Sequence, residues 1–250
     1  MFCSSISTAL RSPSDLIPDE PLEGFHCALT MGYGLSKLVG ERIVSAARGS
    51  SARAYSLRIG QVSGHSKKGL WNDSEAVPLM IRSALTLKAL PKLDQTCSWF
   101  PVDLLAMTIL ELSKACSQPN ENLLNPGSGS PTDDTVYNLC NFRTFTWQSL
   151  LESLERGGFD FETLSFEDWL KKLRDSEARG EEQSNPAIKL IDHYQSMYGE
   201  KTLGSQGQKT FITDKAERDS VTLRSGPLHI IEDGVLERYI HDWLTRWVRV

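Results

Sequence analysis

The chain has 250 residues, of which 40% are hydrophobic, and this composition is typical of a folded globular protein and excludes a disordered acidic chain. Its 27 basic and 32 acidic side chains leave a formal net charge of −5, which argues against a nucleic-acid binder that works through bulk positive charge. No apolar run is as long as the roughly 18 residues typical of a membrane-spanning helix, so we expect neither a nucleic-acid nor a membrane partner.

The N-terminal elements alternate between strand and helix. Residues 1–6 indicate the end of a buried strand that runs into a small polar turn, and residues 7–26 contain three prolines and are typical of a loop. Apolar residues at three- and four-residue steps predict a helix over 29–47. Residues 52–59 predict a second strand, followed by a glycine-containing loop over 60–69.

The same alternation continues toward the middle of the chain. A helix is predicted over 75–90 and a short extended piece over 97–102. Asp103 is placed to cap a helix over 104–115. Residues 135–140 predict another strand. Strands that alternate with helices in this way favour a parallel α/β sheet.

The pattern changes after residue 145, where helices replace strands. The last of these helices is expected to have Asp233 as its N-cap. We therefore expect two regions, an α/β region over 1–145 and a mainly helical subdomain over 146–250. The helices predicted for the second region cover 147–154, 166–173, 187–198 and 235–247.

Tyr33 and Lys37 form a Tyr-x-x-x-Lys motif within the first predicted helix. Residues four apart share one face of a helix, so the hydroxyl and the ammonium project to the same side. An ammonium beside a phenol favours the phenolate, and such a tyrosine can exchange a proton with a substrate oxygen. The motif alone is a weak signal, because a tyrosine and a lysine at this spacing often occupy an ordinary, partly exposed helix face.

The surroundings of this motif strengthen a catalytic interpretation. Ser4 and Ser5 end the first predicted strand, about thirty residues upstream, where a serine hydroxyl can bind the same substrate oxygen. Residues 58–64 directly follow the second predicted strand. Ligands of open α/β sheets bind at the carboxyl ends of strands, so two strand ends and one helix are expected to meet at one place.

Taken together, Ser4 to Ser7, Tyr33 to Lys37 and Leu57 to Gly64 resemble the extended short-chain dehydrogenase/reductase family. More specific segments are similar to the C-terminal thioester reductase domains of fungal nonribosomal-peptide-synthetase-like and adenylate-forming reductase enzymes. These segments are Gly69 to Asn72 with Glu75 and Pro78, Leu90-Pro91, Ser98 to Asp103, Asn185 to Ala187, and Phe211 to Thr213. The resemblance implies a partial Rossmann-type sheet over 1–145, with interleaved substrate-region segments, and a substrate- and carrier-binding subdomain over 146–250.

The function implied by the resemblance is NADPH-dependent release of an acyl thioester in secondary metabolism. The acyl group is carried on the phosphopantetheine arm of a carrier protein and leaves as an aldehyde or an alcohol. By position, Tyr33 is the proton donor, Lys37 favours its ionised form and holds the cofactor ribose, and Ser5 is the catalytic serine. Tyr33 and Lys37 thus also bind the cofactor, and the residues expected near the nicotinamide are Gly60, Gln61 and Val62.

The chain departs from this family in one respect: it has no G-x-x-G-x-x-G turn to hold the cofactor pyrophosphate. Gly127 and Gly129 are a poor substitute, because they do not open an apolar helix after a clear strand. We expect on the order of 100 residues of the nucleotide-binding half to be absent. Truncation is favoured over a degenerate remnant or completion by another chain, and the choice between NADPH and NADH stays open.

Two other functions remain in view. One is a free-standing extended short-chain dehydrogenase or epimerase acting on a small substrate, and the other is a non-catalytic remnant that binds a carrier domain or another partner. The five cysteines and five histidines show no metal-ligand spacing, so no metal is expected. The start of the chain lacks a secretory pattern, and the odd, widely spaced cysteines suit a reducing cytoplasm.

Overall fold

The computed structural model describes residues 1–30, 32–49, 52–117, 135–199 and 209–248. They form two compact units, each built from three separate stretches of the chain. The first unit comprises Met1–Val62, Ser98–Arg143 and Gln208–Pro227, and the second comprises Ser63–Cys97, Thr144–Gly207 and Leu228–Val250. One boundary between the units falls at Arg143/Thr144, but residues 63–97 before it belong to the second unit and residues 208–227 after it belong to the first.

A three-stranded parallel sheet forms the centre of the first unit, as the alternation of strands and helices predicted. Its order is β1 (Phe2–Ser5), β3 (Ser56–Ile59) and β8 (Val136–Leu139). Ser5 pairs with Ile59, and Ile59 pairs with Leu139, so the three strands reach their carboxyl ends at the same level. This common edge is where the candidate residues of two strand ends are brought together.

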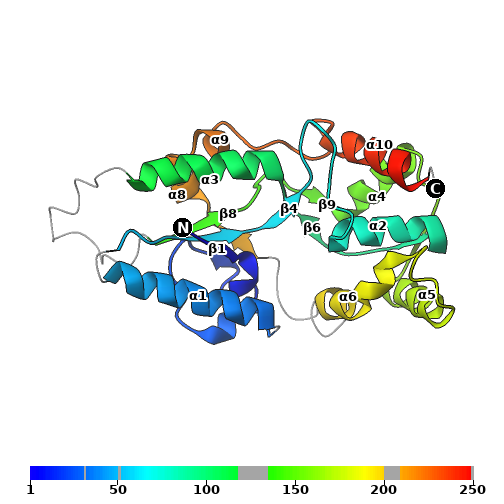
Figure 1. Ribbon diagram of the computed structural model, residues 1–250, viewed down its shortest axis with the longest axis horizontal. Coiled ribbons are helices and arrows are strands. Elements are labelled where there is room, and N and C mark those ends of the chain that lie inside the picture. The colour runs from blue at the N-terminus through cyan, green and yellow to red at the C-terminus, as the bar shows by residue number, and fades with distance from the viewer. Residues whose placement is uncertain (31, 50–51, 118–134, 200–208, 249–250) are drawn as a thin grey trace. The chain divides into compact units, whose positions relative to one another are not determined.

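Helices cover the two faces of this sheet (Figure 1), with α1 (Gly32–Gly49) on one side and α3 (Val102–Ser117) on the other. Side chains of β3 alternate between the faces: Leu57 joins an apolar cluster with Leu105 and Leu112 of α3, and Arg58 turns to the α1 side. The short helices α8 (Asp214–Asp219) and α9 (Val221–Arg224) pack with α3.

Short elements complete the first unit around the sheet ends. The strand β1 passes directly into the 3-10 helix η1 (Ile6–Thr8), and η2 (Phe25–Cys27) precedes α1. The strand β2 (Leu16–Ile17) pairs in parallel with β11 (Thr210–Phe211). The strand β4 (Gln61–Ser63), which follows β3 after Gly60, pairs with β7 (Trp99–Pro101).

One glycine allows α1 to lie close to β1. A Cβ atom added at Gly40 would lie only 2.3 Å from Cζ of Phe2, so any larger residue would collide with that ring. The close contact matters for the site, because α1 carries Tyr33 and Lys37 and β1 carries Ser5. Gly40 therefore lets the Phe2 ring of the strand lie directly against the helix.

The second unit is mainly helical. Aromatic rings pack together in it: Trp243 and Trp247 stack at 5.2 Å with an interplanar angle of 11°, and Trp71 lies against Tyr239 and Trp243. The strands β5 and β10 are parallel, and β6 and β9 are antiparallel. The elements are α2 (Ala76–Leu87), β5 (Ala89–Pro91), β6 (Thr96–Cys97), β9 (Phe145–Thr146), α4 (Trp147–Arg156), β10 (Glu162–Leu164), α5 (Phe166–Ala178), η4 (Pro186–Leu190), α6 (Ile191–Tyr198) and α10 (Val235–Trp247).

Several predicted element boundaries were wrong. The helix predicted to reach residue 90 ends at Leu87, because Lys88 takes a left-handed conformation with φ of 50° and the chain then enters β5. Asp233 does not cap α10, whose N-cap is Gly234; its Oδ2 atom instead accepts a hydrogen bond from the His229 amide at 2.7 Å.

Two further predictions differ in detail. Asp103 lies inside the first turn of α3, which begins two residues earlier than expected, so it complements the helix dipole rather than capping the helix. The helix predicted over 187–198 is divided into η4 and α6, because the chain begins with a tighter 3-10 turn after Asn185-Pro186. In the ranges that the structure covers, no helix is long and apolar enough to cross a bilayer.

Candidate active site

Ser5 is the last residue of β1 and also the N-cap of η1. Its Oγ atom accepts a hydrogen bond from the Ser7 amide at 3.2 Å, and the residue is half-buried. Because Oγ acts as an acceptor in this contact, its own proton stays available for another acceptor. The strand end thus presents a hydroxyl that is held in place and can still donate a hydrogen bond.

Tyr33 and Lys37 lie one turn apart on α1, as the motif predicted. The Lys37 Nζ atom is 5.5 Å from the centroid of the Tyr33 ring and 5.3 Å from that of Phe2. The same ammonium donates a hydrogen bond to the Cys3 carbonyl oxygen at 2.8 Å, which brings the lysine onto the strand that carries Ser5. Tyr33 is 55% exposed, so its hydroxyl can reach a substrate from solvent.

Gly60, Gln61 and Val62 follow the end of β3 in the same unit. The Gly60 amide donates to the Leu139 carbonyl at 3.0 Å, which continues the ladder between the two strands. A Cβ atom at Gly60 would lie 3.3 Å from Sγ of Cys140. Burial raises the pKa of the Cys140 thiol to about 12, so this neighbour is an uncharged wall.

The structure also reveals a buried ion pair that the sequence analysis missed. Glu41 lies on α1, eight residues after Tyr33 and four after Lys37, and its carboxylate contacts Arg58 of β3, with 2.7 Å between Nη2 and Oε2. The side chains of Arg58 and Glu41 are 0% and 4% exposed. The four-residue spacing was a signal in the sequence, because it places Glu41 on the same helix face as the motif.

The donors at this site suit one end of a nicotinamide nucleotide. The Lys37 ammonium and the Tyr33 hydroxyl are the types of group that bind ribose hydroxyls and a carbonyl oxygen, and Gly60 gives a backbone surface with no side chain. The sequence has no glycine-rich turn for the pyrophosphate, and Gly127 and Gly129 lie outside the described residues. The residues therefore fit the ribose and nicotinamide end of the cofactor.

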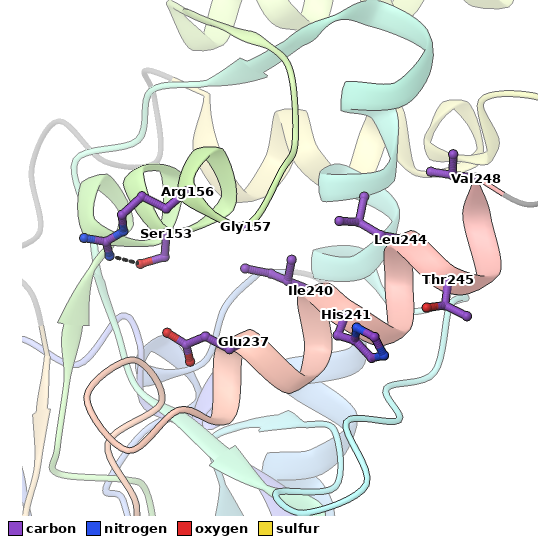
Figure 2. A pocket seen from close by; sticks show the side chains of 9 residues that line it. All are labelled: Ser153, Arg156, Gly157, Glu237, Ile240, His241, Leu244, Thr245 and Val248. Atoms are coloured by element: carbon purple, nitrogen blue, oxygen red, sulfur yellow. Dashed lines mark hydrogen bonds between the residues drawn. The ribbon is translucent and has the colours of Figure 1, made fainter.

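A separate groove of about 530 Å³ lies in the second unit, between the C-terminal end of α4 and one side of α10 (Figure 2). Ile240 and Leu244 form its apolar floor, while Arg156, whose Nη2 atom donates to Ser153 Oγ at 2.9 Å, lies on its polar rim. Gly157 lets the helices approach, since a Cβ atom there would lie 2.7 Å from Ile240 Cγ2. The other lining residues are Glu237, His241, Thr245 and Val248. Among the described residues, no group of three or more His, Cys, Asp or Glu side chains could hold a metal ion.

Comparison with known proteins gives three findings. An NAD-binding family model described as "Male sterility protein" matches residues 8–109. The adenylate-forming reductase Nps10 of Heterobasidion annosum is 32% identical over 74% of this chain, and the non-reducing polyketide synthase sor2 of Hypocrea jecorina is 31% identical over 97% of it. The chain spans only 16% and 9% of the lengths of these two relatives.

The solved structures agree with the fold. The terminal R domain from the myxalamid PKS-NRPS biosynthetic pathway superposes with a TM-score of 0.75 at 20% identity, over 99% of this chain and 58% of that one. At this identity the match establishes the fold, a Rossmann-type α/β arrangement, and it extends over nearly all of this chain. What the longer relatives do as whole proteins reaches this chain only as a proposal.

Proposed function

We propose that this chain, which is related to the NAD(P)-binding reductase domains of fungal polyketide synthases and adenylate-forming reductases, carries the catalytic residues of a thioester reductase. Its substrate is an acyl group held as a thioester on the phosphopantetheine arm of a carrier domain. The product is the aldehyde, or the alcohol after a second reduction. The observation that carries the proposal is the hydrogen bond from Lys37, one turn after Tyr33 on α1, to the Cys3 carbonyl of the strand that ends at Ser5 in register with β3.

The chemistry asked of the chain is proton transfer and orientation. The Tyr33 hydroxyl donates a proton to the thioester carbonyl oxygen as hydride reaches the carbonyl carbon, which gives a hemithioacetal. The free proton of Ser5 Oγ donates a hydrogen bond to the same oxygen and stabilises its developing charge. The Tyr33 phenolate then takes back the hydroxyl proton of the hemithioacetal, the carbon–sulfur bond breaks to release the aldehyde, and the pantetheine sulfur leaves as a thiolate that takes up a proton from water.

A bound nicotinamide nucleotide, NADPH in our proposal, supplies the hydride and leaves oxidised. For this chain the relevant task is to hold its ribose, which we assign to Lys37 with help from Tyr33. Gly60, Gln61 and Val62 are proposed to line the nicotinamide, since they directly follow the carboxyl end of β3 and Gln61 is exposed. The five free cysteines suit a reducing compartment, which supports the cytoplasmic location that we propose.

The groove of the second unit is the proposed contact surface for the pantetheine arm or its acyl group. An apolar floor of Ile240 and Leu244 suits an acyl chain, and the Arg156 guanidinium on the rim suits a phosphodiester. We expect Leu244→Asp, at a half-buried position of the floor, to lower kcat/KM at least tenfold for a carrier-bound thioester and for a soluble acyl-pantetheine alike, because both carry the arm and the acyl group. An unchanged kcat/KM for both substrates would argue against this assignment.

Tyr33→Phe is the direct test of catalysis. Purified chain is mixed with NADPH or NADH and a series of acyl-pantetheine thioesters, and nucleotide oxidation and trapped aldehyde are measured together. Loss of a positioned proton donor should lower kcat by about 10²–10⁴-fold with little change in nucleotide affinity. Tyr55→Phe, which removes a hydroxyl elsewhere in the same unit, is the matched control and should leave kcat within about threefold of wild type.

A non-catalytic carrier-binding protein is the second candidate, favoured by the lack of a glycine-rich pyrophosphate turn in the sequence. It predicts saturable binding of a phosphopantetheinylated carrier without nucleotide oxidation. Turnover that depends on Tyr33 would exclude it. Carrier binding without any nucleotide binding would favour it over the reductase.

A further inference from the structure

The carboxylate of Glu41 gathers groups from three parts of the first unit. Its Oε1 atom accepts from Ser4 Oγ at 2.5 Å, and Arg58 Nε lies 3.1 Å from each carboxylate oxygen. Thr8 Oγ1 lies 3.1 Å from Glu41 Oε1 and 2.8 Å from the Ser5 carbonyl oxygen, so its single proton is shared between two acceptors. Arg58 in turn donates to the Pro18 carbonyl at 3.3 Å.

These contacts surround Ser5 along the chain. Ser4 precedes it in β1, and Thr8 closes the 3-10 turn that follows it. Both neighbours are buried and both are bonded to Glu41, whereas the Ser5 hydroxyl points to another partner, the Ser7 amide. The one carboxylate therefore fixes the strand end and the turn on either side of the proposed catalytic serine.

The same carboxylate is rigidly linked to the other two catalytic candidates. Tyr33, Lys37 and Glu41 follow each other at four-residue steps on α1, so they share a helix face. Glu41 holds that face against β1 and, through Arg58, against β3. Glu41 thus links the strand end that carries Ser5 to the helix that carries Tyr33 and Lys37.

We propose that Glu41, neutralised by Arg58, is a positioning residue that holds the Ser5 turn in register with Tyr33 and Lys37. It acts through Ser5 and does not touch substrate or cofactor. The proposal deepens the reductase function of the preceding section and rests on it. We expect the Glu41–Arg58 pair to fix the positions of the groups around it and not to raise stability, because a buried ion pair is often no better for stability than hydrophobic residues of similar size.

A double-mutant cycle separates positioning from mere stabilisation. Ser5→Ala and Glu41→Gln are each expected to lower kcat about 10- to 100-fold with KM for the nucleotide within threefold. The double variant should be no slower than the worse of the two single variants, because Glu41 works through the hydroxyl that Ser5→Ala has already removed. Losses that multiply in the double variant would overturn the proposal.

Glu111→Gln is the matched control. Glu111 also gathers hydroxyl and amide donors in the same unit, from Ser220 at 2.5 Å and from the Thr222 amide at 3.0 Å, but it lies on α3. Its loss should lower the unfolding temperature and leave kcat within threefold. Its effect should also multiply with that of Ser5→Ala. An equal loss of kcat from Glu111→Gln would show that Glu41 is only structural.

A second variant guards against a failure to fold. In the paired change Glu41→Met with Arg58→Met, hydrophobic side chains fill the buried space without an unpaired charge. This protein should unfold close to the wild-type temperature and still show the 10- to 100-fold loss in kcat. A stable paired variant with wild-type kcat would overturn the positioning role.

A readout independent of turnover keeps this proposal distinct from the reductase proposal. Amide hydrogen exchange at Ser7, whose N–H donates to Ser5 Oγ, reports whether the serine is held in place. We expect at least tenfold faster exchange at Ser7 in Glu41→Gln, with no change in Glu111→Gln. If wild type shows no nucleotide turnover but Ser7 responds in this way, the reductase proposal fails while the positioning by Glu41 stands. If Ser7 does not respond, the positioning role itself is wrong.

Discussion

Replacing Arg58 by methionine removes the cation that faces the Glu41 carboxylate and leaves that carboxylate buried. The structure places the pair at the buried extreme, with side chains 0% and 4% exposed and three nitrogen–oxygen contacts of 2.7, 3.1 and 3.1 Å. Breaking a pair of this kind by removing one partner costs about 3–5 kcal/mol of unfolding free energy. The loss of unfolding free energy exceeds the energy of the broken hydrogen bonds, because the remaining carboxylate is buried without a compensating charge.

The assay is equilibrium unfolding in urea, followed by circular dichroism, for wild type, Arg58→Met and the paired Glu41→Met, Arg58→Met protein. The paired change removes both charges, so its unfolding free energy should return to within about 1 kcal/mol of wild type or exceed it. Lys172→Met is the control for an exposed pair. Lys172 and Glu162 are 43% and 57% exposed, so breaking that contact should cost at most about 1 kcal/mol.

Two results would refute this reasoning. One is an Arg58→Met protein that loses less than about 1 kcal/mol, which would mean that Glu41 is neutral or solvated in the folded state. The other is a paired variant that is less stable than the single variant. Either outcome would remove the physical basis for treating the pair as a buried unit.

Gly40→Ala should lower the unfolding free energy by about 1–3 kcal/mol, because its Cβ atom would lie 2.3 Å from the Phe2 ring. Gly32→Ala, whose Cβ atom would meet nothing within 4 Å, should not lower the unfolding free energy. Thermal unfolding of both variants checks this. Equal effects of the two alanines would contradict the close approach of α1 and β1. Cys3 is exposed and should react first with a thiol reagent at pH 8, while Cys97 and Cys140, whose pKa values burial raises to about 12, should react only after unfolding. The same pKa shifts predict that the thiols' contribution to the unfolding free energy is fully present below pH 9 and is lost as the pH rises from 9 toward 12, since the thiols of the unfolded chain ionise first. Cys140→Ala should make that decline shallower. An unchanged pH profile would contradict the burial of a protonated thiol.

Helical periodicity in the sequence predicted the helices that bury one apolar face. The helix over 235–247 has the observed bounds, and the helix carrying Tyr33 and Lys37 begins three residues later and ends two residues later than its predicted range of 29–47. The errors arose where distant segments decide the backbone. The strand β5 pairs with β10, which lies more than seventy residues later in the chain. No local sequence pattern around Lys88 indicates this pairing, so the end of the helix there was not predicted.

The candidate site shows the same division between local and long-range information. The spacing of Tyr33 and Lys37 and the polar end of the first strand were local signals, so these residues could be predicted as site candidates from the sequence. The partnership of Glu41 with Arg58, Ser4 and Thr8 depends on which strands lie beside α1. A buried charge is also unexpected from composition alone, since charged residues are rarely buried unless they are paired.

The proposed activity of this chain is the transfer of hydride to a thioester carbonyl. The most direct measurement uses NADPH deuterated at the transferable position of the nicotinamide, together with an acyl-pantetheine thioester, and analyses the released aldehyde by mass spectrometry. The proposed activity predicts an aldehyde with one deuterium on its carbonyl carbon, formed by wild type and formed at least about 100-fold more slowly by Tyr33→Phe. An aldehyde without deuterium, or no aldehyde from a protein that binds the nucleotide, would contradict it.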